Sequence, residues 1–369
     1  MGIRNAGPFF NDKDIEDILN DIRNSLKSGI LTMGKNIEQF ENQFAKYIGV
    51  KYAIALNSGT SALEVALRYF DVKNKEVIVP TNSFVASANA VIFAGGEPIL
   101  CDTKDETLCI DPDDFRKKIT PKTKGVIVVH LAGLIPPQMK ELKDICSENN
   151  LFLIEDAAHA PGASLDNKKA GSLGDAGCFS FFPTKPMTTG EGGMITTNDS
   201  NLANFAKSLR HHGKEGDAHT RLGYNWRMSE IHAILGIYQL KRLDEHIAIR
   251  NQIAKKYAEG LENVGGISLI SVPSNIVHSY WKYPIILTSG IEALDLQKIL
   301  KNKYDIDTGT LYYPPIHLQP FYKQRFNYKE GMLPSAEGIL KKETCLPMFV
   351  GLSEKETDYV IDSLKKEIG

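Results

Sequence analysis

The sequence predicts an α/β protein with a large domain, built on a mainly parallel mixed sheet, and a smaller α+β domain at the C-terminus. Short apolar runs alternate with helical patterns along the first half of the chain, which is typical of a parallel sheet with helices on both faces. The length of 369 residues is enough for about two domains. The order of elements changes after Gly265-Gly266. We assign residues 1–245, including two N-terminal helices, to the large domain and 246–369 to the small one, with the boundary inside the long segment that leads out of the large domain.

Seven short apolar runs are the predicted strands of the large domain. They lie at 52–56, 76–79, 98–101, 125–129, 151–154, 178–182 and 193–197. Helical patterns separate most of them, for example Ser83–Ala94 and Pro137–Asn149, and two more, at 12–28 and 36–47, precede the first strand.

A long segment with helical periodicity leads out of the large domain. It extends from Ser229 to Leu261, and its apolar positions suggest a helix that lies against two layers. Beyond it, the pattern predicts a strand at Tyr280–Leu287 and helices at 291–303 and 354–367.

Composition and charge exclude several classes of protein. Lysine plus arginine total 43 and aspartate plus glutamate 45, and no basic tract indicates binding to nucleic acid or to an acidic membrane surface. The N-terminus has no apolar signal core, and no apolar run approaches the ~20 residues that span a bilayer. The five cysteines are odd in number and lack C-x-x-C spacing, so neither a disulfide framework nor a zinc site is expected. Reduced thiols fit a cytoplasmic protein.

Lys185 lies between a short aromatic strand, Cys178–Phe182, and a turn rich in threonine and glycine, Thr188–Gly193. This position places a primary amine on the rim of a loop. An amine in a partly apolar pocket loses its proton more easily and becomes a nucleophile toward aldehydes. The chemistry that this suggests is a Schiff base with pyridoxal 5'-phosphate (PLP). The alternative is an ordinary surface lysine.

A candidate phosphate site follows the first strand. The strand 52–56 leads into a turn of small residues, 57–61, and then into a helical pattern. The free N–H groups of Thr60 and its neighbour would point outward, and the helix dipole would favour negative charge there. Gly59 lets the backbone come close to a ligand. The alternative is a plain helix cap made by Ser58 or Thr60.

An acidic pair, Glu155-Asp156, ends the apolar run Leu151–Ile154. It therefore lies at the carboxyl end of a predicted strand, where open α/β sheets bind ligands. A buried carboxylate at Asp156 would keep a pyridine nitrogen protonated, and the ring could then accept electrons. The alternative for Asp156 is a helix N-cap. His159 could hydrogen-bond the phenolic oxygen of the cofactor, or be a core histidine with satisfied hydrogen bonds.

The segment Gly223–Ser229 mixes polar and aromatic residues without alternation, as binding loops do. Asn225 is its candidate ligand, and the alternative is a helix entry capped by Asn225 or Ser229. The pair His211-His212 is a poor metal site, because adjacent helix residues point in different directions and no carboxylate or cysteine cluster accompanies them. No metal is expected.

In this order the motifs resemble the sugar aminotransferases of the DegT/DnrJ/EryC1/StrS family. The likeness extends from about residue 8 to the C-terminus. It is carried by Asn57–Ala62, Glu155–Ala160, Ser180–Lys185, Thr188–Gly193, His212-Gly213 and Gly223–Met228. Each motif alone is weak, whereas the ordered set is specific. The resemblance implies the aspartate aminotransferase-like architecture, fold type I of PLP enzymes.

The resemblance also implies PLP as the cofactor and gives roles to the candidates. Lys185 would carry PLP and move the proton during amino transfer, and Asp156 would pair with the pyridinium nitrogen. The phosphate would be held by Gly59, Thr60 and Ser180.

Three further cofactor contacts follow from the resemblance. Phe84 would stack on the ring, with a core aromatic as the alternative. His159 stands where the family often has glutamine, and both side chains can donate a hydrogen bond. Asn225 would reach the phosphate from a neighbouring subunit, so a homodimer with shared active sites is expected.

The sugar site is the least defined part of the resemblance. Thr32 and the segment Tyr312–Pro320 resemble parts of the family that line the sugar pocket, and the two tyrosines, Tyr312 and Tyr313, and His317 could bond sugar hydroxyls. The alternative is a proline-stiffened loop that packs on the core. His211 stands where the family commonly has asparagine or aspartate, which makes it a candidate for substrate contact and altered specificity.

The implied function is the transfer of an amino group from L-glutamate to a keto sugar, nucleotide-linked by preference, for amino-sugar and polysaccharide biosynthesis. A free keto-sugar acid is the alternative acceptor. A sugar 3-dehydratase of the same family carries histidine in place of Lys185, and a non-catalytic regulator would not need Lys185, Asp156 and Ser180. A dinucleotide-binding dehydrogenase lacks support, because no G-x-G-x-x-G follows the first strand.

Overall fold

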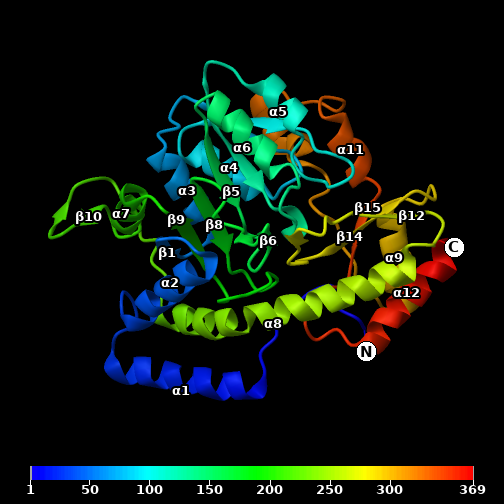
Figure 1. The fold of residues 1–369 in the computed structure, drawn as a ribbon, viewed down its shortest axis with the longest axis horizontal. Coiled ribbons are helices and arrows are strands. Elements are labelled where there is room, and N and C mark those ends of the chain that lie inside the picture. The colour runs from blue at the N-terminus through cyan, green and yellow to red at the C-terminus, as the bar shows by residue number, and fades with distance from the viewer. Residues whose placement is uncertain (1, 369) are drawn as a thin grey trace.

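The computed structural model describes residues 2–368, and its centre is a seven-stranded sheet of order β1-β9-β8-β5-β4-β2-β3 (Figure 1). The pairings among β3, β2, β4, β5 and β8 are parallel, whereas β9 runs antiparallel to β8 and β1. The strands are β1 Tyr52–Leu56, β2 Glu76–Pro80, β3 Glu97–Cys101, β4 Thr123–Val129, β5 Phe152–Asp156, β8 Ala176–Ser180 and β9 Gly193–Thr197. The predicted mixed, mainly parallel sheet is confirmed strand by strand.

Helices cover both faces of this sheet, because successive residues of a strand point to opposite sides. In β1, Ile54 and Leu56 belong to one apolar core and Ala53 and Ala55 to the other. The first core packs on α3 Gly59–Tyr69, α4 Val85–Phe93 and α7 Ser200–Leu209. The second packs on α2 Lys35–Ile48, α5 Pro112–Lys118, α6 Met139–Glu148 and the beginning of α8 Glu230–Leu261.

The helix α8, Glu230–Leu261, extends along the molecule past both of its larger sheets (Figure 1). Its beginning packs against α1 (Asp12–Ser28) and α2, and its end against β12 (Ile267–Leu269) and α12 (Glu354–Ile368). The predicted helix between two layers is therefore found. Residue 245, the predicted domain boundary, falls inside α8, and the division at 245/246 stays a prediction.

The C-terminal third forms a second, antiparallel sheet of order β12-β14-β15. Its apolar core includes residues of α8 and of two helices that flank the sheet, α9 and α12. The elements are β12 Ile267–Leu269, β14 Tyr283–Leu287, β15 Glu343–Leu346, α9 Ala293–Tyr304 and α12 Glu354–Ile368. This α+β arrangement agrees with the prediction for the C-terminal part.

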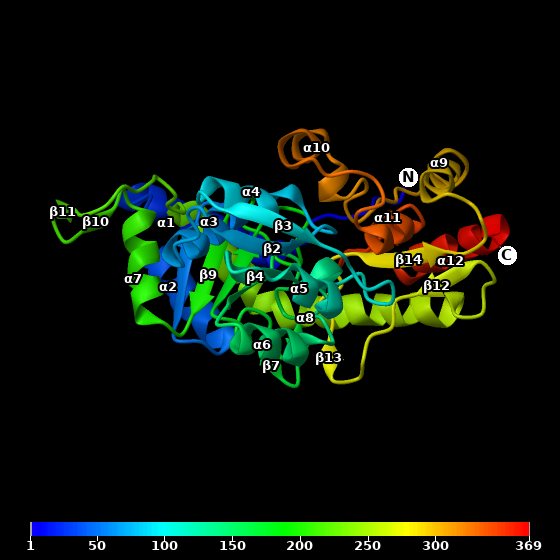
Figure 2. The same ribbon diagram turned by 90° about the horizontal axis from the view of Figure 1, so that it is seen from above.

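The remaining elements are the 17-residue helix α1 and several short helices and strands. A hairpin of β10 and β11 stands away from the body in both views (Figures 1 and 2). The bounds are α1 Asp12–Ser28, α10 Pro320–Phe326, α11 Pro334–Leu340, β6 Ser164–Leu165, β7 Lys168–Lys169, β10 Lys214–Glu215, β11 Ala218–His219 and β13 Ile276–Val277. Within residues 2–368 no helix is both long and apolar enough to cross a bilayer, and no three His, Cys, Asp or Glu are grouped to hold a metal ion.

The predicted site residues lie along one edge of the large sheet. Because β2, β4, β5 and β8 are parallel, their carboxyl ends lie along the same edge. Asp156 is the last residue of β5, Ser180 is the last of β8, and Thr81 follows β2. The amino end of α3 reaches this edge through β1.

Candidate active site

A cavity of about 380 Å³ opens at this edge of the sheet. Its lining combines one amine, two carboxylates, several hydroxyls and a set of aromatic rings. The lining residues are Ser58, Gly59, Thr60, Leu63, Ser83, Phe84, Ala86, Asp156, Ala158, His159, Ser180, Phe182, Thr184, Lys185, Glu191, Trp281 and Tyr312. All the residues predicted to hold the cofactor within one chain are among them.

Lys185 points into the cavity from the turn after β8. Its Nζ lies 3.9 Å from the centroid of the Trp281 ring. Protein atoms surround the amine on most sides, and this loss of hydration lowers the pKa of Lys185 to about 7. The charge of Asp156 opposes the shift, and that of Lys282 adds to it. Near neutral pH a substantial fraction of the amine is therefore uncharged and nucleophilic.

Asp156 faces the same cavity from the end of β5. Its Oδ2 accepts a 2.7 Å hydrogen bond from the Ser87 hydroxyl, and its Oδ1 accepts one of 3.2 Å from the Ala158 N–H. Burial raises the pKa of Asp156, while the Ser87 hydroxyl, the Ala158 N–H and the positive charge of Lys185 oppose that rise.

The amino end of α3 forms the floor of the predicted phosphate site. Ser58 is the N-cap, since its side chain accepts a hydrogen bond from the Ser61 N–H, so the capping interpretation is confirmed and the phosphate site stays a prediction. The first N–H groups of the helix, at Gly59 and Thr60, have no acceptor within the helix and are free for an anion. A Cβ on Gly59 would lie 2.9 Å from the Cβ of Ser180, so glycine lets these two segments meet.

Three roughly parallel rings form a wall of the cavity. The rings of His159 and Trp281 stack with centroids 3.9 Å apart, and the Tyr312 hydroxyl lies 2.8 Å from His159 Nε2. Burial lowers the pKa of His159 well below its ordinary value, so the ring is neutral. Two ring nitrogens of the wall, His159 Nδ1 and Trp281 Nε1, are buried and have no hydrogen-bond partner within residues 2–368.

Phe84 is the N-cap residue of α4 and lies at the mouth of the cavity. Its side chain is 54% exposed, which rules out the alternative of a core aromatic. Its ring is tilted against that of Tyr312, with centroids 5.6 Å apart.

These residues fit PLP. The fit depends on observations at different points of the cavity: an amine with a pKa of about 7, a buried carboxylate, an anion site at a helix terminus, and a neutral ring nitrogen without a partner. Fold and site together define a PLP-dependent enzyme of fold type I.

The chain belongs to the DegT/DnrJ/EryC1/StrS aminotransferase family, whose sequence model matches residues 12–365. It is a PLP-dependent aminotransferase, and the predicted family, enzyme class and cofactor are confirmed.

Named relatives extend over nearly the whole chain. GDP-perosamine synthase from Caulobacter vibrioides is 38% identical over 343 residues, with 91% of each protein covered. UDP-4-amino-4,6-dideoxy-N-acetyl-beta-L-altrosamine transaminase from Campylobacter jejuni is 33% identical over 348 residues, with 92% of each covered. The solved structure of DesV from S. venezuelae, in complex with a ketimine intermediate, superimposes with a TM-score of 0.92 at 30% identity and covers 98% of both chains.

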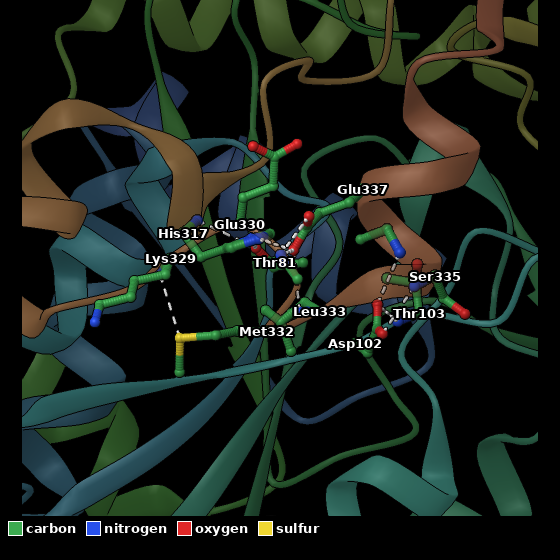
Figure 3. Close-up of polar contacts among 12 residues, drawn as sticks. Thr81, Asp102, Thr103, His317, Lys329, Glu330, Met332, Leu333, Ser335 and Glu337 are labelled. Atoms are coloured by element: carbon green, nitrogen blue, oxygen red, sulfur yellow. Dashed lines mark hydrogen bonds and ion pairs between the residues drawn. The ribbon is translucent and has the colours of Figure 1, made fainter.

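His317 does not line the cavity. It is fully buried, with Nδ1 2.8 Å from Thr81 Oγ1 and Nε2 2.9 Å from Glu337 Oε1 (Figure 3). Both ring nitrogens are engaged, so none remains for a sugar hydroxyl. We name Thr81, His317 and Glu337 the His317 network. It joins the segment between β14 and β15 to the end of β2, and this segment packs in an apolar core of the large sheet, which agrees with the alternative of a loop packed on the core.

In the segment that follows His317, several backbone N–H groups donate hydrogen bonds to two side-chain carboxylates (Figure 3). Glu337 also accepts hydrogen bonds from the N–H groups of Gly331 and Leu333. Asp102, after β3, accepts them from Ser335 and Ala336 at the beginning of α11.

Tyr313 does not line the cavity either; its neighbour Tyr312 does. The backbone explains the difference. Tyr312 has a φ of 65°, a left-handed conformation that is uncommon outside glycine, so the side-chain directions in this segment do not follow simple alternation.

Thr32, His211 and Asn225 lie outside the cavity of their own chain. Thr32 is exposed and forms a bridge with Ser229, beside the beginning of α8. His211 and Asn225 pair with each other near the β10–β11 hairpin, and Asn225 is exposed. The His211 Nδ1 lies 2.8 Å from the guanidinium of Arg227.

Trp281, Glu191 and Ser87 are site residues that the sequence did not reveal, and Tyr312 was predicted only as a sugar contact and not as a partner of His159. Glu191 lies in the Thr188–Gly193 turn, so its motif was recognised although its side chain was not singled out. Trp281 precedes β14 of the other sheet, and nothing local to it indicates a position over Lys185. Ser87 is one of several small residues in an apolar helical pattern, and nothing in the sequence marks it as a partner of Asp156.

Proposed function

We propose that this enzyme transfers the amino group of L-glutamate to a nucleotide-linked keto sugar, for the biosynthesis of amino sugars of polysaccharides. The observation that carries the proposal is the Lys185 amine, with a pKa of about 7, facing the same cavity as Asp156. Two relatives that match nearly the whole chain in sequence are named for GDP-linked and UDP-linked sugars, which supports a nucleotide-linked acceptor. Because the names of these two relatives refer to sugars on different nucleotides, we do not assign the nucleotide of the acceptor.

The residues of the cavity divide the chemistry among them. PLP, when bound, supplies an aldehyde and an electron-withdrawing ring. The uncharged Lys185 amine can bind the aldehyde, and once released it can carry a proton between neighbouring carbons because it stays tethered beside them. The Asp156 carboxylate would bond a protonated ring nitrogen, and Gly59, Thr60 and Ser180 would hold the phosphate.

The ring wall and Phe84 orient the flat cofactor in this proposal. The exposed face of Phe84 would stack on one side of it. The neutral His159 would donate a hydrogen bond from Nδ1 to a phenolic oxygen, since Nε2 is already bonded to Tyr312.

A panel of acceptors tests the proposal. Purified enzyme is incubated with L-glutamate and GDP-, UDP- or dTDP-linked keto sugars, and the product is identified by mass spectrometry. We expect one class of nucleotide-linked sugar to gain an amino group and Lys185→Ala to give no product. Amination of a free keto-sugar acid alone would assign the alternative acceptor.

We propose further that the active enzyme is a homodimer in which Asn225 completes the partner's site. Three observations support this. Asn225 is exposed and lies outside the cavity of its own chain. Apolar side chains of α1, Ile15, Leu19 and Leu26, are 39–58% exposed. Leu222, near the projecting hairpin, is 83% exposed.

A complementation experiment tests the shared site. Lys185→Ala and Asn225→Ala chains should each be inactive alone, and their co-expression should produce mixed dimers with one intact site. Random mixing predicts about a quarter of wild-type activity. Absence of recovery in dimers shown to be mixed would place Asn225 outside the partner's site, and an active monomer in sedimentation would exclude the dimer itself.

A further inference from the structure

A buried hydroxyl relay ends on the carboxylate of Asp156. Ser87 belongs to α4, 69 residues before Asp156, and is fully buried. Its hydroxyl donates a 2.7 Å hydrogen bond to Asp156 Oδ2. The hydroxyl of Ser83 lies 2.7 Å from that of Ser87 and is also buried.

The direction of the relay follows from the number of protons. A serine hydroxyl has one hydrogen, and that of Ser87 goes to Asp156, because an ionised carboxylate only accepts. Ser87 must therefore accept from Ser83. Each donor polarises the next, so the bond that reaches the carboxylate is stronger than an isolated one. Ser83 Oγ has a longer contact with the Phe84 carbonyl, 3.3 Å, which competes weakly.

We propose that Ser87 is a positioning residue, which keeps Asp156 ionised and aimed at the ring nitrogen of PLP. The inference depends on PLP binding, which the family establishes, and not on the identity of the sugar.

The surroundings of Asp156 explain why such a donor matters. The carboxylate is buried, and burial alone raises its pKa. The Ala158 N–H is a longer contact, at 3.2 Å to the other oxygen. The positive charge of Lys185 and the ring of His130, both nearby, favour the ionised form, but the Lys185 amine loses its charge near pH 7. Cys178 and Tyr312 also face Asp156, and burial raises the pKa of each, so they stay neutral.

The bond to Ser87 also fixes geometry. The carboxylate is held at Oδ2 from α4 and at Oδ1 from the backbone of the following turn. These two contacts leave lone pairs for the cavity, which Asp156 lines. A short hydrogen bond to a charged group is among the stronger polar contacts of a protein interior.

The test is the affinity of the apoenzyme for PLP as a function of pH, measured by fluorescence titration without substrates. We expect Ser87→Ala to weaken PLP binding about tenfold to a hundredfold. We also expect the acidic limb of its pH profile to move to higher pH, because Asp156 loses the donor that favours its charge. Ser363→Ala is the matched control, since Ser363 is an equally buried serine with one hydrogen bond in α12, far from the cavity.

A double-mutant cycle distinguishes action through Asp156 from a general loss of packing. In an Asp156→Asn background, Ser87→Ala should weaken PLP binding less than about threefold, because no charge remains to stabilise. Ser87→Cys keeps the size of the side chain with a weaker donor, and it should show a smaller shift in the same direction. This variant replaces Ser87→Ala if the alanine protein does not fold.

Three results would overturn the proposal: an unmoved acidic limb in the Ser87 variants, an equal shift in Ser363→Ala, or a full effect of Ser87→Ala in the Asp156→Asn background. Because PLP affinity is read without sugar or glutamate, failure of the proposed acceptor would leave this measurement unchanged.

Discussion

The cavity and the His317 network each contain a buried neutral histidine, yet the two histidines have different numbers of partners. His317 has both ring nitrogens bonded, to Thr81 and Glu337. His159 has one nitrogen bonded to Tyr312 and one without a partner in the described part of the chain. Since a buried polar atom without a partner is costly, such an atom at a cavity indicates a place for a ligand, whereas a saturated histidine indicates a structural joint.

Removal of Lys185 tests the cavity side of this comparison and has the largest expected effect. Lys185→Ala should lower amino transfer by about 10⁴-fold or more, because one amine serves as nucleophile and as proton carrier. Borohydride reduction of the PLP-loaded protein, followed by peptide mass spectrometry, should add a pyridoxyl mass to Lys185. Lys282→Met should keep the label on Lys185, and a label on another lysine would contradict the assignment.

Removal of His317 tests the structural side. His317→Ala should lower the free energy of unfolding by about 2–4 kcal/mol, because Thr81 and Glu337 lose their buried partner and a cavity opens. Urea denaturation of the PLP-loaded protein measures the change. The exposed His219 is the control, and His219→Ala should stay within about 0.5 kcal/mol of wild type. A stable His317→Ala protein that had lost only sugar binding would restore the sequence-based interpretation.

Replacement of His159 should instead affect the ligand. His159→Ala should weaken PLP binding about tenfold, through loss of one hydrogen bond and of ring packing. His159→Gln keeps a donor at the same place and should remain within about threefold of wild type. Titration of the apoenzyme with PLP measures both. Equal affinities for wild type and His159→Ala would remove His159 from the cofactor site.

The smallest expected effect concerns pH. The Lys185 amine is uncharged above its pKa of about 7, so the rate at which the apoenzyme captures PLP should rise as pH increases through 7 and level off above about pH 8. Because the charge of Lys282 lowers the pKa of Lys185, Lys282→Met should move this midpoint upward and slow capture at pH 7 less than about tenfold. Stopped-flow absorbance measures the rate, and an unmoved midpoint would show that Lys282 has no such influence.

Local patterns were sufficient for the sheet edge. Asp156 was identified because it follows an apolar run, and parallel strands bring their carboxyl ends together. Ser180 was assigned through the family resemblance, inside a strand predicted at 178–182 that ends at Ser180 in the structure. The turn at Gly59 was identified from small residues before a helical pattern. In each case, the signal and the residue lie within the same few positions of the chain.

The ring wall could not be predicted in this way. Trp281 and Tyr312 reach the cavity from segments beside the second sheet, and their position depends on how the two sheets pack. His317 was misread for the same reason, because its partners Thr81 and Glu337 are distant in sequence or on another element. Because the backbone at Tyr312 is left-handed, the alternation of side chains in an extended segment does not predict which of the two adjacent tyrosines faces the cavity.

The single long helix α8 restricts how this enzyme can be recombined with its relatives. The beginning of α8 packs in the apolar core on one face of the large sheet, and its end packs in the core of the sheet β12-β14-β15. A chimaera joined near residue 245 would combine two half-helices whose packing partners evolved separately. A junction at Gly265-Gly266, beyond the end of α8, would exchange the downstream segment that carries Trp281 and Tyr312 and leave the helix from one parent.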